Sequence, residues 1–107
     1  MFSLLIALQV ATVQPAPAFA PVVQPSGRIA KIIHKRDGRT KASAFKVKNV
    51  GEEYEILRTF GLKPDVQSLV IDDDRRAFDM LTAIDPNTGA KVELWFDISS
   101  FYGKDIF

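Results

Sequence analysis

Cysteine is absent from the 107-residue chain, and histidine and tryptophan occur once each, as His34 and Trp95. Without cysteine there can be no disulfide framework, thiolate metal site, cysteine nucleophile or cysteine-attached lipid anchor. A single histidine cannot build a histidine metal cage within one chain. The sequence also lacks a Gly-rich phosphate loop, a G-x-S-x-G nucleophile turn and an H-E-x-x-H zinc motif. We therefore predict no catalytic residue, no metal site and no cofactor.

The first twenty residues carry no charged side chain and are typical of a secretory signal. Their apolar run, 2–13, would rise about 18 Å as a helix, less than the roughly 30 Å hydrocarbon core of a bilayer. Small residues follow, so we predict a signal peptide over 1–20 with cleavage after Ala18 or Ala20. No Lys or Arg follows Met1, and a docked N-terminal helix is the alternative interpretation. Export would place the mature chain, without a membrane span, in the periplasm or outside the cell.

Prolines then mark the boundary of the folded part. Four of them fall between residues 14 and 25, a composition that favours extended polyproline II structure. We assign 21–25 to a tether and 26–107 to one globular domain. A domain of this size without disulfides or a metal must depend on the packing of its core for stability.

Two helices are predicted from hydrophobic spacing and capping residues. The first begins after Ser26 as N-cap and ends at Asp37-Gly38. The second spans 50–60, with Asn49 and Glu52 as a capping box and a glycine just past its end. Its expected apolar face consists of Val50, Tyr54, Leu57 and Phe60.

Alternating hydrophobicity predicts four strands, at 43–48, 66–71, 78–84 and 91–98. The connection 85–89 predicts a hairpin with Gly89 at positive φ and a bulge there. Matching the apolar faces of the last two strands places Ile84 opposite Val92. The order α-β-α-β-β-β predicts an α+β fold: a small single domain with an antiparallel sheet and its helices on one face.

Several short motifs resemble a family of small exported bacterial domains of unknown function. They are the turn Asp37-Gly38-Arg39-Thr40, the strand Ala44-Phe45-Lys46-Val47, the helix start Glu52-Glu53-Tyr54 and the strand Leu94-Trp95-Phe96-Asp97-Ile98-Ser99. The resemblance covers about residues 36–102. It implies export and supports the domain boundaries, and it implies nothing about activity.

Charge is distributed unevenly along the chain. Residues 28–48 carry a net charge of +7, and the chain from residue 49 onward carries −6. If the basic turn at 35–41 is exposed, it forms a cationic tip that binds an anionic polymer or an acidic protein face. The predicted binding residues of this tip are Arg36, Arg39 and Lys41. In the alternative, the basic segment packs against the acidic half of the same molecule. Nucleic acid is disfavoured by the predicted compartment.

Trp95 is the fourth candidate binding residue. In the predicted register it shares the outer sheet face with Leu81 and Ala83. Either the first helix covers this face, or Trp95 is an exposed aromatic platform for a partner.

The sequence thus favours an exported, non-enzymatic envelope binding module whose partner is an unknown envelope protein or anionic polymer. The alternative function is a small hydrolase or lyase that uses carboxylates. Self-association through open edge strands is a third interpretation.

Overall fold

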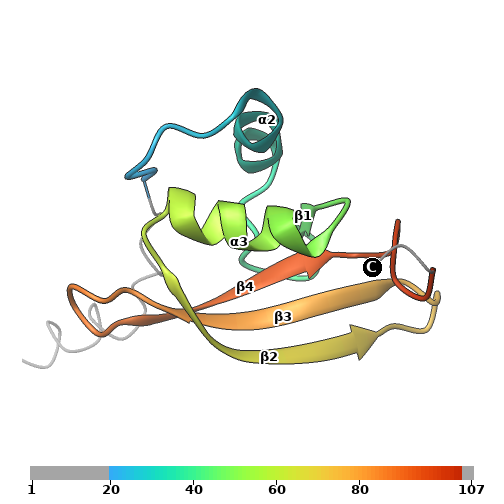
Figure 1. Ribbon diagram of the computed structural model, residues 1–107. Helices are drawn as coiled ribbons and strands as arrows, with labels where there is room; N and C mark the ends of the chain where they lie inside the picture. Colours follow the sequence, from blue (N-terminus) through green and yellow to red (C-terminus); the bar gives the residue numbers. More distant parts are fainter. Residues whose placement is uncertain (1–19, 105–107) are drawn as a thin grey trace, which may run out of the picture.

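The computed structural model describes residues 20–104, so the predicted signal peptide lies outside the described residues except for Ala20. In that range two helices lie on one side of a four-stranded sheet (Figure 1). The elements are α2 (Gly27–Lys35), β1 (Phe45–Lys46), α3 (Val50–Thr59), β2 (Lys63–Ile71), β3 (Ala77–Ile84) and β4 (Lys91–Asp97). The predicted α+β class, element order and one-sided helices are confirmed. Neither described helix is long and apolar enough to cross a membrane.

Both helices begin where their capping residues predict. The Ser26 hydroxyl accepts the N–H of Ile29, and the Asn49 side chain accepts the N–H of Glu52 at 2.9 Å. Gly61 follows α3 with φ 70°, a conformation that costs glycine little. The first helix ends at Lys35, two residues earlier than predicted, because the chain is already extended at Arg36.

The sheet has the order β1-β4-β3-β2 and is antiparallel except for the short pair β1–β4, which is parallel. Phe45 of β1 lies opposite Phe96 of β4. Only residues 45–46 of the predicted strand 43–48 pair as a strand, whereas the second strand begins three residues earlier than predicted, at Lys63.

The predicted register of the last hairpin is wrong by one residue. Ile84 lies opposite Lys91, not Val92. The Asp85 N–H donates to the Ala90 carbonyl at 2.9 Å, so the connection is the even loop 86–89 rather than an odd, bulged one. Gly89 has the predicted positive φ, 77°, but the described bulge lies in β2, between Pro64 and Val66.

Because a slip of one residue exchanges the two faces of a strand, this register changes the core. Leu81 and Ala83 face the helices, together with Leu94 of β4. Ile84, which the predicted register places on the same face as Val92, lies on the opposite face, together with Phe78 and Met80.

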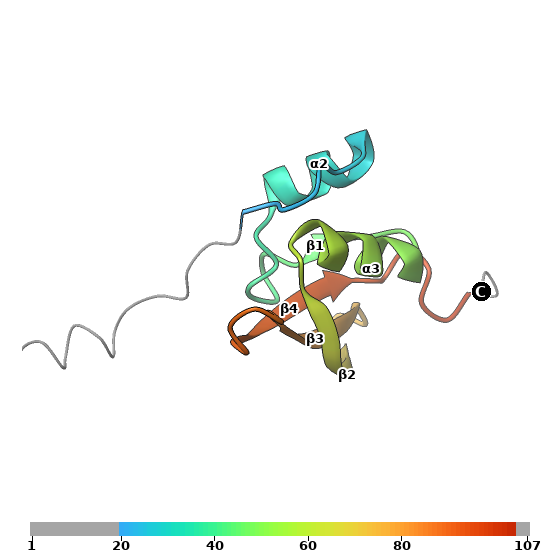
Figure 2. The same cartoon turned by 60° about the vertical axis from the view of Figure 1, so that its left-hand side comes forward.

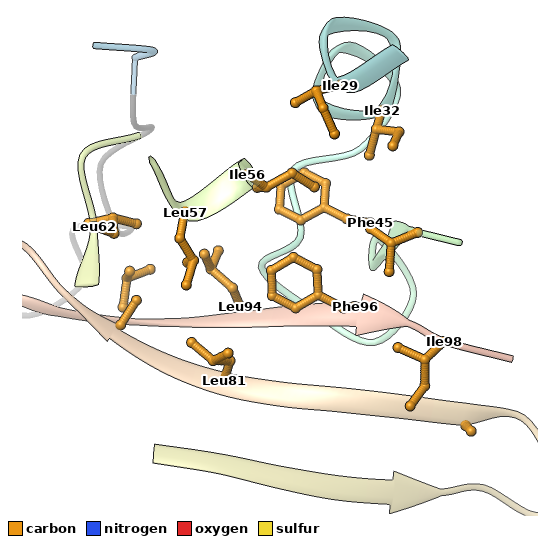
Figure 3. Close-up of a cluster of buried hydrophobic side chains, with 14 of the residues drawn as sticks. Ile29, Ile32, Phe45, Ile56, Leu57, Leu62, Leu81, Leu94, Phe96 and Ile98 are labelled. Atoms are coloured by element: carbon orange, nitrogen blue, oxygen red, sulfur yellow. The ribbon is translucent and has the colours of Figure 1, made fainter. Parts of the chain in front are cut away.

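The core lies between the helices and this sheet face (Figure 3). Ile29 and Ile32 of α2 point toward Ile56 of α3, and the rings of Phe45 and Phe96 meet at 5.7 Å. The expected face of α3 is rotated: it buries Glu53, Ile56 and Leu57, while Val50 and Tyr54 are exposed. Figure 2 shows that α2 lies farther from the sheet than α3.

The predicted tether contacts the domain. The N–H groups of Val22 and Val23 both donate to the carbonyl of Thr59, at 2.7 and 3.3 Å. The chain therefore reaches α2 from the C-terminal end of α3.

Candidate functional site

A cationic groove of about 720 Å³ opens between α2 and β1. Its lining residues are Gly27, Arg28, Lys31, Ile32, Lys35, Arg36 and Lys46. Five of these seven residues are basic and none is acidic. We call this the cationic groove.

Helical spacing brings most of these cations together. Arg28, Lys31 and Lys35 recur at intervals of three and four residues, so they lie on one face of α2. Lys46 comes from β1, where it is the exposed residue between buried Phe45 and Val47. The apolar residues of α2 are used in the core, which leaves its basic face to the groove.

One glutamate fixes α2 to α3. The Arg28 guanidinium contacts both carboxylate oxygens of Glu52, at 2.5 and 3.2 Å. The Lys48 N–H donates to the same carboxylate at 2.8 Å. Burial alone would raise the pKa of Glu52, but the hydrogen bonds from Arg28 and the Lys48 N–H outweigh it and lower the pKa. Glu52 is therefore ionised and paired.

The remaining cations of the groove are available to a ligand. Within residues 20–104, no carboxylate lies at ion-pair distance from Lys31, Lys35 or Lys46. Arg36 donates to the backbone carbonyl of Ala42 at 3.4 Å, a neutral acceptor that leaves its charge uncompensated. The groove thus holds more positive charge than its surroundings neutralise.

The predicted cationic tip does not form a single surface. Arg36 lines the groove, but the following turn folds back, because Asp37 accepts the N–H of Arg39 and the hydroxyl of Ser43. The Ser43 and Arg39 hydrogen bonds hold the pKa of Asp37 below its usual value. Lys41 lies elsewhere, with its Nζ 3.9 Å from an Asp72 carboxylate oxygen. The basic segment is thus partly neutralised by the acidic half of the molecule.

Trp95 lies on the sheet face away from the helices, so the first helix does not cover it, and the alternative of an aromatic platform stays a prediction. Its neighbour there is Phe78, which its ring meets edge-on at 6.2 Å, and not Leu81 or Ala83. Because α2 is on the opposite side of the sheet, it does not cover Trp95, which is half-buried.

Phe78 is fully buried although neither α2 nor α3 lies on its face of the sheet. Besides Trp95, the Arg76 guanidinium lies 5.1 Å from the centre of its ring, and the Lys41 Nζ lies at 5.9 Å. Cations over an aromatic face are attracted by its quadrupole. Arg76 is also held by the Asp97 carboxylate at 3.1 Å. Lys41, Arg76 and Trp95 therefore cover Phe78.

A buried carboxyl pair, missed by the sequence analysis, lies between α3 and β3. Glu53 is 1% exposed and Asp79 is 6% exposed. Burial, followed by the hydrogen bond with Asp79 and the charge of that residue, raises the pKa of Glu53 to about 9. The expected apolar face of this helix did not include Glu53, although its spacing from Ile56 and Leu57 places it on the core face.

Two neighbouring carboxyl groups can act as an acid and a base, but a substrate cannot reach this pair as it would reach an active site. Glu53 Oε2 is buried without a hydrogen-bond partner, and both carboxyl groups are closed to a substrate in solution. Its geometry favours a role in holding α3 on the sheet, with Glu53 in its neutral form.

Comparison of the chain with protein-family models, with curated proteins and with solved structures gave no match. The functional argument therefore depends on the geometry of the cationic groove.

Replacing Glu53 with Gln tests the protonation of the buried pair. With a folded pKa near 9 and an ordinary value of 4.5, Glu53 adds most to stability below pH 4.5. That contribution is lost as the pH rises toward 9, by up to about 1.4 kcal/mol per pH unit. We expect Glu53→Gln to match the wild type near pH 5 and to be the more stable protein at pH 8, measured by urea unfolding.

The matched control is Glu55→Gln, which removes a half-exposed carboxylate from the same helix. Its stability should follow the wild-type pH dependence. Parallel curves for Glu53→Gln and the wild type between pH 5 and 8 would contradict a neutral, buried Glu53.

Proposed function

We propose that this chain is an exported, non-enzymatic module that binds an anionic polymer of the cell envelope through the cationic groove. The observation that carries the proposal is the convergence of five cations on one groove, four of which have no carboxylate partner within residues 20–104. Like charges gathered in this way repel one another, and a bound anion relieves that repulsion.

The shape of the cation array favours a polymer over a single small anion. Arg28 and Lys35 are separated by about 10 Å along α2, since each residue adds roughly 1.5 Å of rise. Lys46 extends the array onto the sheet edge. Repeating anionic groups of an extended chain can contact several of these cations at once and release their counterions.

The other candidate functions have less support. The carboxyl pair Glu53 and Asp79 is closed to a substrate by its burial and so lends no support to a carboxylate-based hydrolase or lyase. Nucleic acid offers the same anionic chemistry as an envelope polymer, and the proposed export of the chain argues against it.

Charge reversal in the groove tests the binding site. We expect the double variant Lys31→Glu, Lys35→Glu to lose at least about tenfold in affinity for dextran sulfate at low salt, because each lost contact removes counterion release. Binding of the wild type should weaken steeply with ionic strength. The measurement is the dissociation constant as a function of salt concentration.

The control variant Arg58→Glu, Lys104→Glu makes the same change in net charge at two exposed positions outside the groove lining. It should bind within about twofold of the wild type if site contacts rather than overall charge decide the affinity. Equal losses in both double variants, or binding that is insensitive to salt, would refute the groove as the site.

Export rests on the uncharged, apolar start of the chain and on the small residues that follow it. N-terminal sequencing of the protein from its native cell should therefore give Phe19 or Pro21 as the first residue. A mature chain that begins with Met1 would contradict export by signal cleavage.

A further inference from the structure

Strand β2 is an open edge of the sheet. In the order β1-β4-β3-β2, one side of β2 has no neighbouring strand within the described chain. The Asp72 N–H donates toward β3, to the Arg76 carbonyl at 3.0 Å. Because bonding direction alternates along an antiparallel strand, the backbone groups of Gln67, Leu69 and Ile71 point outward, away from β3.

This edge lacks the usual protection along most of its length. Soluble proteins block open edges with charges, proline or bulges. In β2 these devices occur only at the start, where Lys63, Pro64 and a bulge precede the residues 66–71. Those six residues contain no charge and no proline, and Val66, Leu69 and Ile71 are 56%, 49% and 49% exposed.

Exposed apolar side chains of α3 lie beside the same edge. Val50 and Tyr54 are on the flank of α3 opposite Glu52, the residue that bonds to α2. Because α2 packs on the β1 side, this flank faces β2, where Leu69 lies beside Asp79 on the helix side of the sheet. Edge and flank together form what we call the β2 edge surface.

We propose that the β2 edge surface pairs antiparallel with the same surface of a second copy of this chain. Pairing would join two four-stranded sheets into one continuous sheet. The outward backbone groups of Gln67 would then bond to those of Leu69 in the second copy. The helices of both copies lie on the same face of this sheet, so the apolar flanks of α3 approach the joint from both sides.

Charge complementarity identifies a second copy as the occupant. Lys63 precedes the uncharged stretch, and Asp73 and Asp74 follow it. With the two-fold axis at Ser68, Val66 of each copy lies opposite Val70 of the other, and Lys63 lies at the same end of the joint as the acidic turn 72–74 of the other copy. A parallel alignment would bring like charges together instead.

Sedimentation equilibrium of the purified protein over a range of concentrations tests this pairing. The wild type should form dimers, and Leu69→Lys should weaken dimerisation by at least about tenfold, because an edge lysine opposes strand addition. Tyr102→Lys is the matched control, since Tyr102 is 44% exposed and lies outside the β2 edge surface. It should dimerise like the wild type.

A charge exchange tests both the partner and the register. Lys63→Asp alone should weaken dimerisation, and adding Asp73→Lys should restore it. These two charge variants test the proposal even if Leu69→Lys fails to fold. A wild type that stays monomeric at every concentration, a Leu69→Lys variant that dimerises unchanged, or an exchange that restores nothing would overturn the proposal.

Discussion

The buried carboxylate of Glu52 is the contact on which the arrangement of the two helices depends. It accepts hydrogen bonds from the Arg28 guanidinium and the Lys48 N–H, while its own N–H is bound by the N-cap Asn49. A buried carboxylate without these partners would cost several kcal/mol, so α2, α3 and the segment between them are fixed together. The same contact turns the basic face of α2 outward and so creates the cationic groove.

Adjacent positions on α3 show how environment decides protonation. Glu52 meets the Arg28 guanidinium and the N–H of Lys48, which favour its charged form. One residue further, roughly 100° around the helix, Glu53 meets an apolar core and the carboxyl group of Asp79, which favour its neutral form. The helix therefore contacts α2 through a charged glutamate and the sheet through a protonated one.

Local signals in the sequence predicted the helices and strands. The strand register and the residues that face the core depend on long-range packing, which those signals do not contain. The caps Ser26 and Asn49 are where their side-chain chemistry places them. The predicted register was wrong because it placed Ile84 on the same face as Val92, whereas Leu81 and Ala83 of β3 share that face. In the folded chain Asp79 is inside with Glu53, and Phe78 on the other face is covered in part by Lys41 and Trp95, which are distant in sequence.

The sequence predicted the positive charge of the candidate site but not its shape. The excess of cations before residue 49 is visible in the sequence, yet Arg36 and Lys41 separate because the chain reverses at Gly38. Gly38 has φ 67°, and a Cβ there would collide with the Phe45 ring, so this reversal depends on packing against the sheet edge. Spacing along the sequence does not contain that information.

The central claim, that the groove held by Glu52 is the anion-binding site, is tested most directly by NMR titration of the isotope-labelled protein with polyphosphate at low salt. The largest amide shifts should occur at residues 27–36 and at Lys46, with the Trp95 indole signal unchanged. Shifts centred on Trp95 and Lys41 with an unperturbed α2, or no shifts at all, would contradict this account.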